Sequence, residues 1–283
     1  EFQLFAAQGY GIVYSNPRGS GGYGYAFKRG NYQDWGDGPA ADVLAAADSA
    51  ATEPWVDPDR QVVTGGSYAG YLTAWIVGHD GRFQAAVAQR GVYDLATFLG
   101  EGNAWRLIPG HFGGYPWDAY VPDVLADSSV ADTMAREPLL AIGFFGESTL
   151  PPDDVNTPDT ESEAGFDESV TAPLTDVAEE KVYALLRRNS PLTYVDSIRT
   201  PLLIMHSDSD LRTGVIQSEM LYKSLKILGR PVEYVRYPEA GHDLSRTGDP
   251  KQRLDRLLRI YEFMERYVGE ESTVPVASSP ASE

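Results

Sequence analysis

The chain has 283 residues, of which 42% are hydrophobic, a formal net charge of −18 and no cysteine. This length suits one large domain or two small ones, and the acidic balance argues against nucleic acid as a partner. No apolar run approaches the roughly 20 residues of a membrane helix. Four scattered histidines lack the spacing of metal ligands, so neither metal nor cofactor is predicted. The absence of cysteine excludes disulfides and fits a cytoplasmic location.

The negative charge is concentrated in two stretches. Residues 147–180 hold eleven acidic residues and residues 268–283 hold three, with no basic residue in either. Both are poor in large apolar residues, so neither can bury enough surface to order itself. We therefore expect a catalytic domain over residues 1–268 with a flexible acidic insertion at about 118–188, and a disordered tail at 269–283.

Strands and helices alternate along the remaining chain, which predicts an α/β protein with a mostly parallel sheet flanked by helices. The expected strands are residues 11–15, 61–65, 84–89, 201–206 and 232–237. The expected helices are residues 42–53, 68–78, 216–228 and 252–267, and residues 121–145 show some helical spacing. In the last helix, one apolar side is predicted to carry Leu254, Leu257, Leu258, Tyr261 and Met264.

The strongest local feature is VVTGGSYAG at residues 62–70, where a β-branched run ends in glycines, a serine and small residues that open a helix. Such a turn needs small neighbours so that the Ser67 hydroxyl is exposed at the helix N-terminus. The usual pattern is Gly-x-Ser-x-Gly, and Ala69 followed by Gly70 departs from it. Glycine-rich turns that contain a serine are common, so the motif alone does not decide the function.

Serine becomes a nucleophile when a base lies within hydrogen-bond reach and a carboxylate orients that base. In this arrangement the order along the chain is serine, acid, histidine, each after a strand. Asp210 follows the expected strand 201–206, and His242 follows the expected strand 232–237. The sequence therefore predicts a triad of Ser67, Asp210 and His242.

Two acidic neighbours compete for the role of the acid. Asp208 lies two residues before Asp210 and is an alternative to it. Asp243 adjoins His242, and a direct neighbour in sequence is expected to point away.

Three other histidines are weighed as the base. His206 ends a strand and is expected to make a structural hydrogen bond, and His79 can cap carbonyls at the end of its helix. His111 lies in a Gly-rich loop and is the remaining alternative base, but it precedes the acid in the chain.

Several segments together resemble the prolyl oligopeptidase family of serine peptidases, in particular its acylaminoacyl-peptidase and dipeptidyl-peptidase branch. They are NPRGSGGYG (16–24), VDPDR (56–60), GGSYAG (65–70), SPLTYVDSIRTPLLIMHSDSDLR (190–212) and YPEAGH (237–242). The resemblance covers roughly residues 2–117 and 189–268 and implies an α/β-hydrolase fold that cuts short peptides.

The resemblance also implies roles for individual residues. The backbone N–H of Tyr68 would form half of the oxyanion hole, and Arg212 would bind a substrate carbonyl, with a loop salt bridge as its alternative. Val92 and Leu95 are candidates for the wall of the specificity pocket, which lies among several loops.

The chain departs from the family pattern in several places. The upstream His-Gly-Gly-Pro segment, the first strands of the sheet and the β-propeller that filters substrates are absent, so we expect a fragment. Ser207 replaces a usual glycine, and Thr213 and Gly214 replace the usual Val-Pro. The long insertion is hypothesised to form a lid or rim over Ser67, against the alternative of a solvated surface loop.

Three functions follow from this reading. The first is a serine peptidase that acts on short or N-terminally blocked peptides through an acyl-enzyme. The second is a carboxylesterase-like serine hydrolase, because the fold alone cannot separate the two. The third is a fragment that is inactive on its own, since losing an oxyanion donor costs about 10²–10³ in rate. A homo-oligomer is left open.

Overall fold

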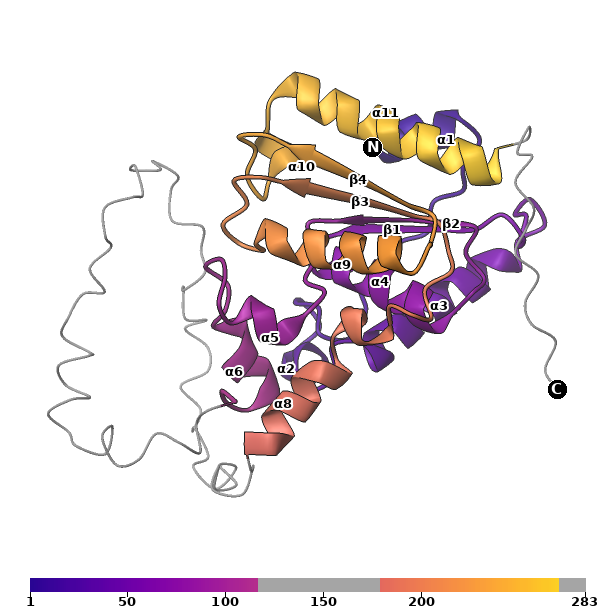
Figure 1. Cartoon of the computed structure of the whole chain (residues 1–283). Helices are drawn as coiled ribbons and strands as arrows, with labels where there is room; N and C mark the ends of the chain where they lie inside the picture. The colour runs from indigo at the N-terminus through magenta and orange to yellow at the C-terminus, as the bar shows by residue number, and fades with distance from the viewer. Residues whose placement is uncertain (117–178, 270–283) are drawn as a thin grey trace, which may run out of the picture. The chain divides into compact units, whose positions relative to one another are not determined.

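The computed structural model describes residues 1–116 and 179–269 (Figure 1). The chain divides into two compact units, one formed by Glu1–Gly114 with Tyr183–Glu283 and the other by Tyr115–Val182. Most of the second unit lies outside the described residues. The same holds for the spacing at 121–145, for nearly all of the expected acidic insertion with its hypothesised lid, and for the tail beyond residue 269.

A four-stranded parallel sheet forms the centre of the first unit. The strands are β1 (Val62–Gly66), β2 (Ala85–Gln89), β3 (Leu202–Ser207) and β4 (Val232–Tyr237), and they lie side by side in that order. Every adjacent pair is parallel. The two central strands are buried along their whole length, as expected for a sheet covered on both faces. The predicted α/β class is confirmed, and these four strands lie within one residue of their predicted bounds.

The fifth predicted strand, at residues 11–15, is wrong. These residues are not a strand, and Val13 and Tyr14 are 51% and 78% exposed. Residues 11–15 and β1 line the same cleft of about 1730 Å³, together with residues of α3 (Asp37–Ala51) and α11 (Pro250–Val268). A run with β propensity becomes a strand only where a neighbour pairs with its backbone. Among the strands of residues 1–116 and 179–269, β1 pairs with β2 alone.

Helices cover both faces of the sheet (Figure 1). Helices α1 (Phe2–Ala7) and α11 lie over one face, and α3, α4 (Tyr68–His79) and α9 (Val215–Ile227) lie over the other. The remaining helices of the described residues are α2 (Tyr25–Lys28), α5 (Leu95–Phe98), α6 (Leu107–Phe112), α8 (Glu179–Arg188), a 3₁₀ turn (Pro191–Tyr194) and α10 (Leu244–Thr247). Helix α3 begins five residues before its predicted start, because Pro39 is tolerated in the first turn of a helix.

The alternation of side chains along the central strands separates two apolar clusters. Ala86, Ala88, Leu202 and Ile204 face α4 and α9. Ala85, Val87, Leu203 and Met205 face α11. Successive residues of a strand point to opposite faces, so one strand supplies both cores.

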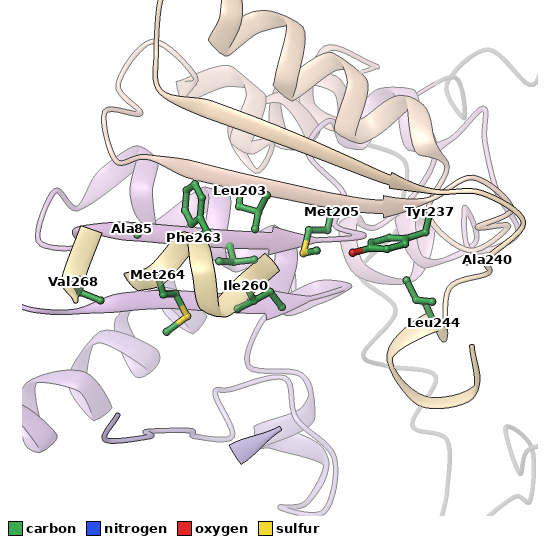
Figure 2. Close-up of a cluster of buried hydrophobic side chains, with 11 residues drawn as sticks. Ala85, Leu203, Met205, Tyr237, Ala240, Leu244, Ile260, Phe263, Met264 and Val268 are labelled. Carbon is green, nitrogen blue, oxygen red and sulfur yellow. The ribbon is translucent and has the colours of Figure 1, made fainter. Parts of the chain in front are cut away.

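Helix α11 buries only part of the side predicted for it, with Met264 buried as expected. Its buried residues include Ile260, Phe263 and Met264 (Figure 2), whereas Leu254 and Leu258 are 57% and 47% exposed. The apolar residues of this helix extend around more of its surface than one stripe, so their spacing did not identify the packed side. Within the described residues, no helix has both the length and the apolar character needed to cross a membrane.

Candidate active site

Ser67 lies on the turn that joins β1 to α4. Its backbone has φ 61° and ψ −123°, a conformation that costs a non-glycine residue energy and is common at functional turns. Its N–H donates to the carbonyl of Gln89 at 2.9 Å, and its own carbonyl accepts from Tyr71 at 3.0 Å. These bonds to β2 and to the first turn of α4 hold the strained residue in place.

The turn tolerates alanine at position 69 because its partner is glycine. A Cβ added at Gly65 would lie 2.5 Å from the Cβ of Ala69. The departure from the usual pattern is therefore accommodated by the missing side chain of Gly65. Gly70 is required for a different reason, since a Cβ there would lie 2.3 Å from the carbonyl oxygen of Gln89 on β2.

The structure brings the three predicted side chains together. The ring of His242 is within hydrogen-bond reach of both partners, with Nε2 at 3.0 Å from Ser67 Oγ and Nδ1 at 2.7 Å from Asp210 Oδ2. The residues follow β1, β3 and β4, and parallel strands present their carboxyl ends at one edge of the sheet. Since Oδ2 accepts, Nδ1 carries a proton, which leaves Nε2 able to accept from the Ser67 hydroxyl.

Asp210 is 5% exposed and its carboxylate is saturated with donors. Oδ1 accepts from the backbone N–H groups of Arg212 at 2.9 Å and Thr213 at 3.0 Å. Oδ2 accepts from His242 and from the Thr213 hydroxyl at 3.1 Å. Burial acts to raise the pKa of Asp210, but the hydrogen bonds from His206, His242 and the Thr213 backbone outweigh it and hold that pKa well below its ordinary value.

The competing acids point elsewhere. Asp208 is exposed and pairs with Arg236 of β4, with 2.7 Å between Oδ1 and Nε. Asp243 bonds Arg246 on its own helical turn. Neither carboxylate forms the bond to Nδ1 of His242 that Asp210 forms.

The other histidines have structural partners. His206 is buried between the hydroxyl of Ser218, 2.6 Å from Nδ1, and the carbonyl of Thr213, 2.8 Å from Nε2. His79 Nδ1 lies 2.8 Å from the carbonyl of Trp75, the capping contact predicted for it. His111 packs edge-on against Trp35 with ring centroids 5.1 Å apart, and burial lowers its pKa.

The four residues predicted to form the oxyanion hole or to contact substrate differ from one another in position and exposure. Tyr68 is the first residue of α4, so its N–H lies outside the internal hydrogen bonds of the helix. Arg212 is exposed beside the acid. Val92, in the loop after β2, and Leu95, the first residue of α5, are 5% and 0% exposed. Both are packed inside the protein, and their part in a pocket stays a prediction.

Two further polar residues lie in the site and were not predicted as part of it from the sequence. Gln217 of α9 is fully buried, and its side-chain carbonyl accepts from the N–H groups of Tyr93 and Asp94, each at 2.7 Å. The Thr213 hydroxyl contacts the acid directly. The only sequence signal for Thr213 was its place in a segment that departs from the family pattern.

Comparison with known proteins gives consistent relationships. The model of the prolyl oligopeptidase family matches residues 1–141 and 148–271. An uncharacterized peptidase YuxL of Bacillus subtilis is 35% identical over 95% of this chain and 32% of its own length. Dipeptidyl-peptidase 5 of Porphyromonas endodontalis is 24% identical over 85% of this chain and 26% of its own.

Solved structures show the same likeness. Acylaminoacyl peptidase of Pyrococcus horikoshii superposes with a TM-score of 0.69 at 25% identity and covers 96% of this chain and 35% of its own. A puromycin hydrolase has the same fold, with a TM-score of 0.62 at 18% identity over 93% of this chain and 30% of its own. The chain thus spans about a third of the length of the proteins that it matches.

Proposed function

Because this chain belongs to the prolyl oligopeptidase family, we propose that it hydrolyses peptide bonds through Ser67, His242 and Asp210. The observation that carries the proposal is the ring of His242, which is hydrogen-bonded to Asp210 on one side and to Ser67 on the other. Such a bridge lets the imidazole take the serine proton while the carboxylate stabilises the resulting cation.

The reaction proceeds in two halves. Ser67 Oγ attacks the scissile carbonyl, His242 Nε2 takes its proton, and the tetrahedral oxyanion forms beside the start of α4. There the N–H of Tyr68 donates to the oxyanion. His242 then protonates the leaving amine, which departs and leaves an acyl-enzyme. Water, activated by the same imidazole, hydrolyses the ester and restores Ser67.

We infer short or N-terminally blocked peptides as the substrate class. A structure at 25% identity and a TM-score of 0.68 is an acylaminoacyl peptidase in complex with Z-Gly-Gly-Phe-chloromethyl ketone, a blocked peptide derivative. Arg212 is exposed two residues after the acid, which supports a role for it in contacting a substrate carbonyl. For the whole protein, the β-propeller, the cytoplasmic location and the homo-oligomer stay predictions.

Kinetics on matched peptide and ester substrates tests the proposal in the full chain. We expect Ser67→Ala to lower kcat for an acetylated peptide by about 10⁴-fold or more, because the nucleophile is lost. The matched control Ser15→Ala, at an exposed serine, should leave kcat unchanged. If kcat for the acetylated peptide were the same in Ser67→Ala and Ser15→Ala, Ser67 would be removed from the mechanism. Rapid turnover of the ester with none of the peptide would favour the carboxylesterase alternative.

A further inference from the structure

The hydroxyl of Thr213 lies among three polar groups of the site. Its oxygen is 3.1 Å from Asp210 Oδ2, 3.0 Å from the carbonyl of Arg90 and 3.4 Å from Nδ1 of His242. Thr213 is 3% exposed, so little water reaches these contacts. The same carboxylate oxygen therefore faces both the ring of the base and a second side-chain donor.

A hydroxyl has one proton, and the surroundings decide where it goes. Donation to the ionised Oδ2 gives a charge-assisted hydrogen bond, about twice as strong as one to a neutral carbonyl. Donation to Arg90 would instead leave the hydroxyl lone pairs 3.1 Å from a negative oxygen. The proton therefore belongs on the side of Asp210. His206 also approaches Oδ2, with its Nε2 at 3.4 Å, and contributes to the low pKa of Asp210. It is unchanged by a substitution of the Thr213 side chain, because its closer contact, at 2.8 Å, is to the backbone carbonyl of Thr213.

From this geometry we infer that Thr213 is a positioning residue that weakens the hold of Asp210 on the protonated imidazole, and so keeps His242 a free base at lower pH. The inference rests on the proposed peptidase function. A carboxylate that shares its charge with an extra donor attracts the imidazolium less. Valine, the residue usual in the resembling family, has nearly the same shape but no proton to donate.

Other charged groups lie near His242, and they are the same in the wild type and in a variant of Thr213. Asp243 and Arg246 form an ion pair that begins one residue after His242. The partly buried Arg90 interacts with both Asp210 and Asp243 from the turn after β2. Glu101, from the loop after α5, interacts with Asp210 and His206, and burial raises its pKa. A Thr213 substitution removes none of these groups.

The experiment compares Thr213→Val with Thr213→Ser in the full chain, with two readouts. One is the NMR titration of the His242 imidazole, assigned by its loss in His242→Gln. The other is the acid limb of kcat/KM. We expect Thr213→Val to move both toward higher pH by about half a unit. Thr213→Ser keeps the hydroxyl and should follow the wild type.

The inference would be overturned if Thr213→Val left the His242 titration and the acid limb of kcat/KM unchanged or moved them toward lower pH. It would also be overturned if Thr213→Ser behaved like Thr213→Val. Thr213→Ala provides a second hydroxyl-free variant should the valine perturb folding, and it must show the same upward shift. The NMR titration does not require turnover. It therefore reports on Thr213 even if Ser67→Ala shows that the proposed function is wrong.

Discussion

The residue with the strongest electrostatic demands is Asp210. Its carboxylate is 5% exposed but stays ionised because Arg212, Thr213 and His242 donate hydrogen bonds to it. A carboxyl whose pKa is lower in the folded than in the unfolded chain stabilises the fold at pH values above its unfolded pKa, near 3.9. That contribution is lost as the pH falls through the folded pKa.

The pH dependence of stability tests this balance. In wild type, the free energy of unfolding should fall as the pH is lowered below about 4, between the unfolded pKa and the lower folded pKa of Asp210. In Asp210→Asn, the side chain cannot titrate, so the fall should be shallower. Urea unfolding at a series of pH values measures the two curves. Curves that remain parallel below about pH 4 would show that Asp210 has the same pKa in the folded and unfolded chain.

For single residues, the sequence predicted which residue types occur and in which order along the chain, but not where each side chain points. Asp208 and Asp210 are two residues apart in one loop, and only the fold shows that the first meets Arg236 while the second meets His242. The role of Thr213 was not predictable, because a hydroxyl acquires it only when the loops after β2, β3 and β4 converge.

The element that determines the site is the turn from β1 into α4. The turn packs closely against neighbouring backbone, and it can do so because glycines stand where a side chain would collide. Gly70 packs directly on β2, where a Cβ would lie 2.3 Å from the carbonyl oxygen of Gln89. The carbonyl belongs to a central strand and cannot move without disturbing the sheet.

We predict that Gly70→Ala destabilises the fold by about 1–3 kcal/mol, the usual effect of overpacking, and displaces Ser67. Gly81→Ala is the matched control, because a Cβ there meets nothing within 4 Å, and it should change stability by less than about 0.5 kcal/mol. Chemical denaturation measures both. Equal stability of the two variants would mean that α4 can move away from β2 without cost.

Elements were predictable where local pattern and tertiary partners agree. The four paired strands and helix α4 lie within about one residue of their predicted bounds. Residues 11–15 have a strand-like sequence, but in the part of the chain that the structure describes no strand pairs with them. In α11 the packed side depends on the sheet beneath it, which buries Phe263 and leaves Leu254 exposed.

On the scale of the molecule, the parallel sheet explains how distant residues become one site. Ser67 and His242 are 175 residues apart in the chain, and their contact depends on β1 and β4 ending at the same edge. The order of strands along the chain made this edge predictable. The arrangement of the specificity loops was not, because Val92 and Leu95 are buried by packing that no local pattern specifies.

Covalent labelling of the whole chain by a fluorophosphonate, followed by mass spectrometry of its peptides, tests the central claim most directly. We predict a single adduct on Ser67, formed at a rate that falls at least about 10³-fold in His242→Gln, because the hydroxyl then lacks its base. An adduct on another serine, or labelling of Ser67 that does not depend on His242, would contradict the assignment.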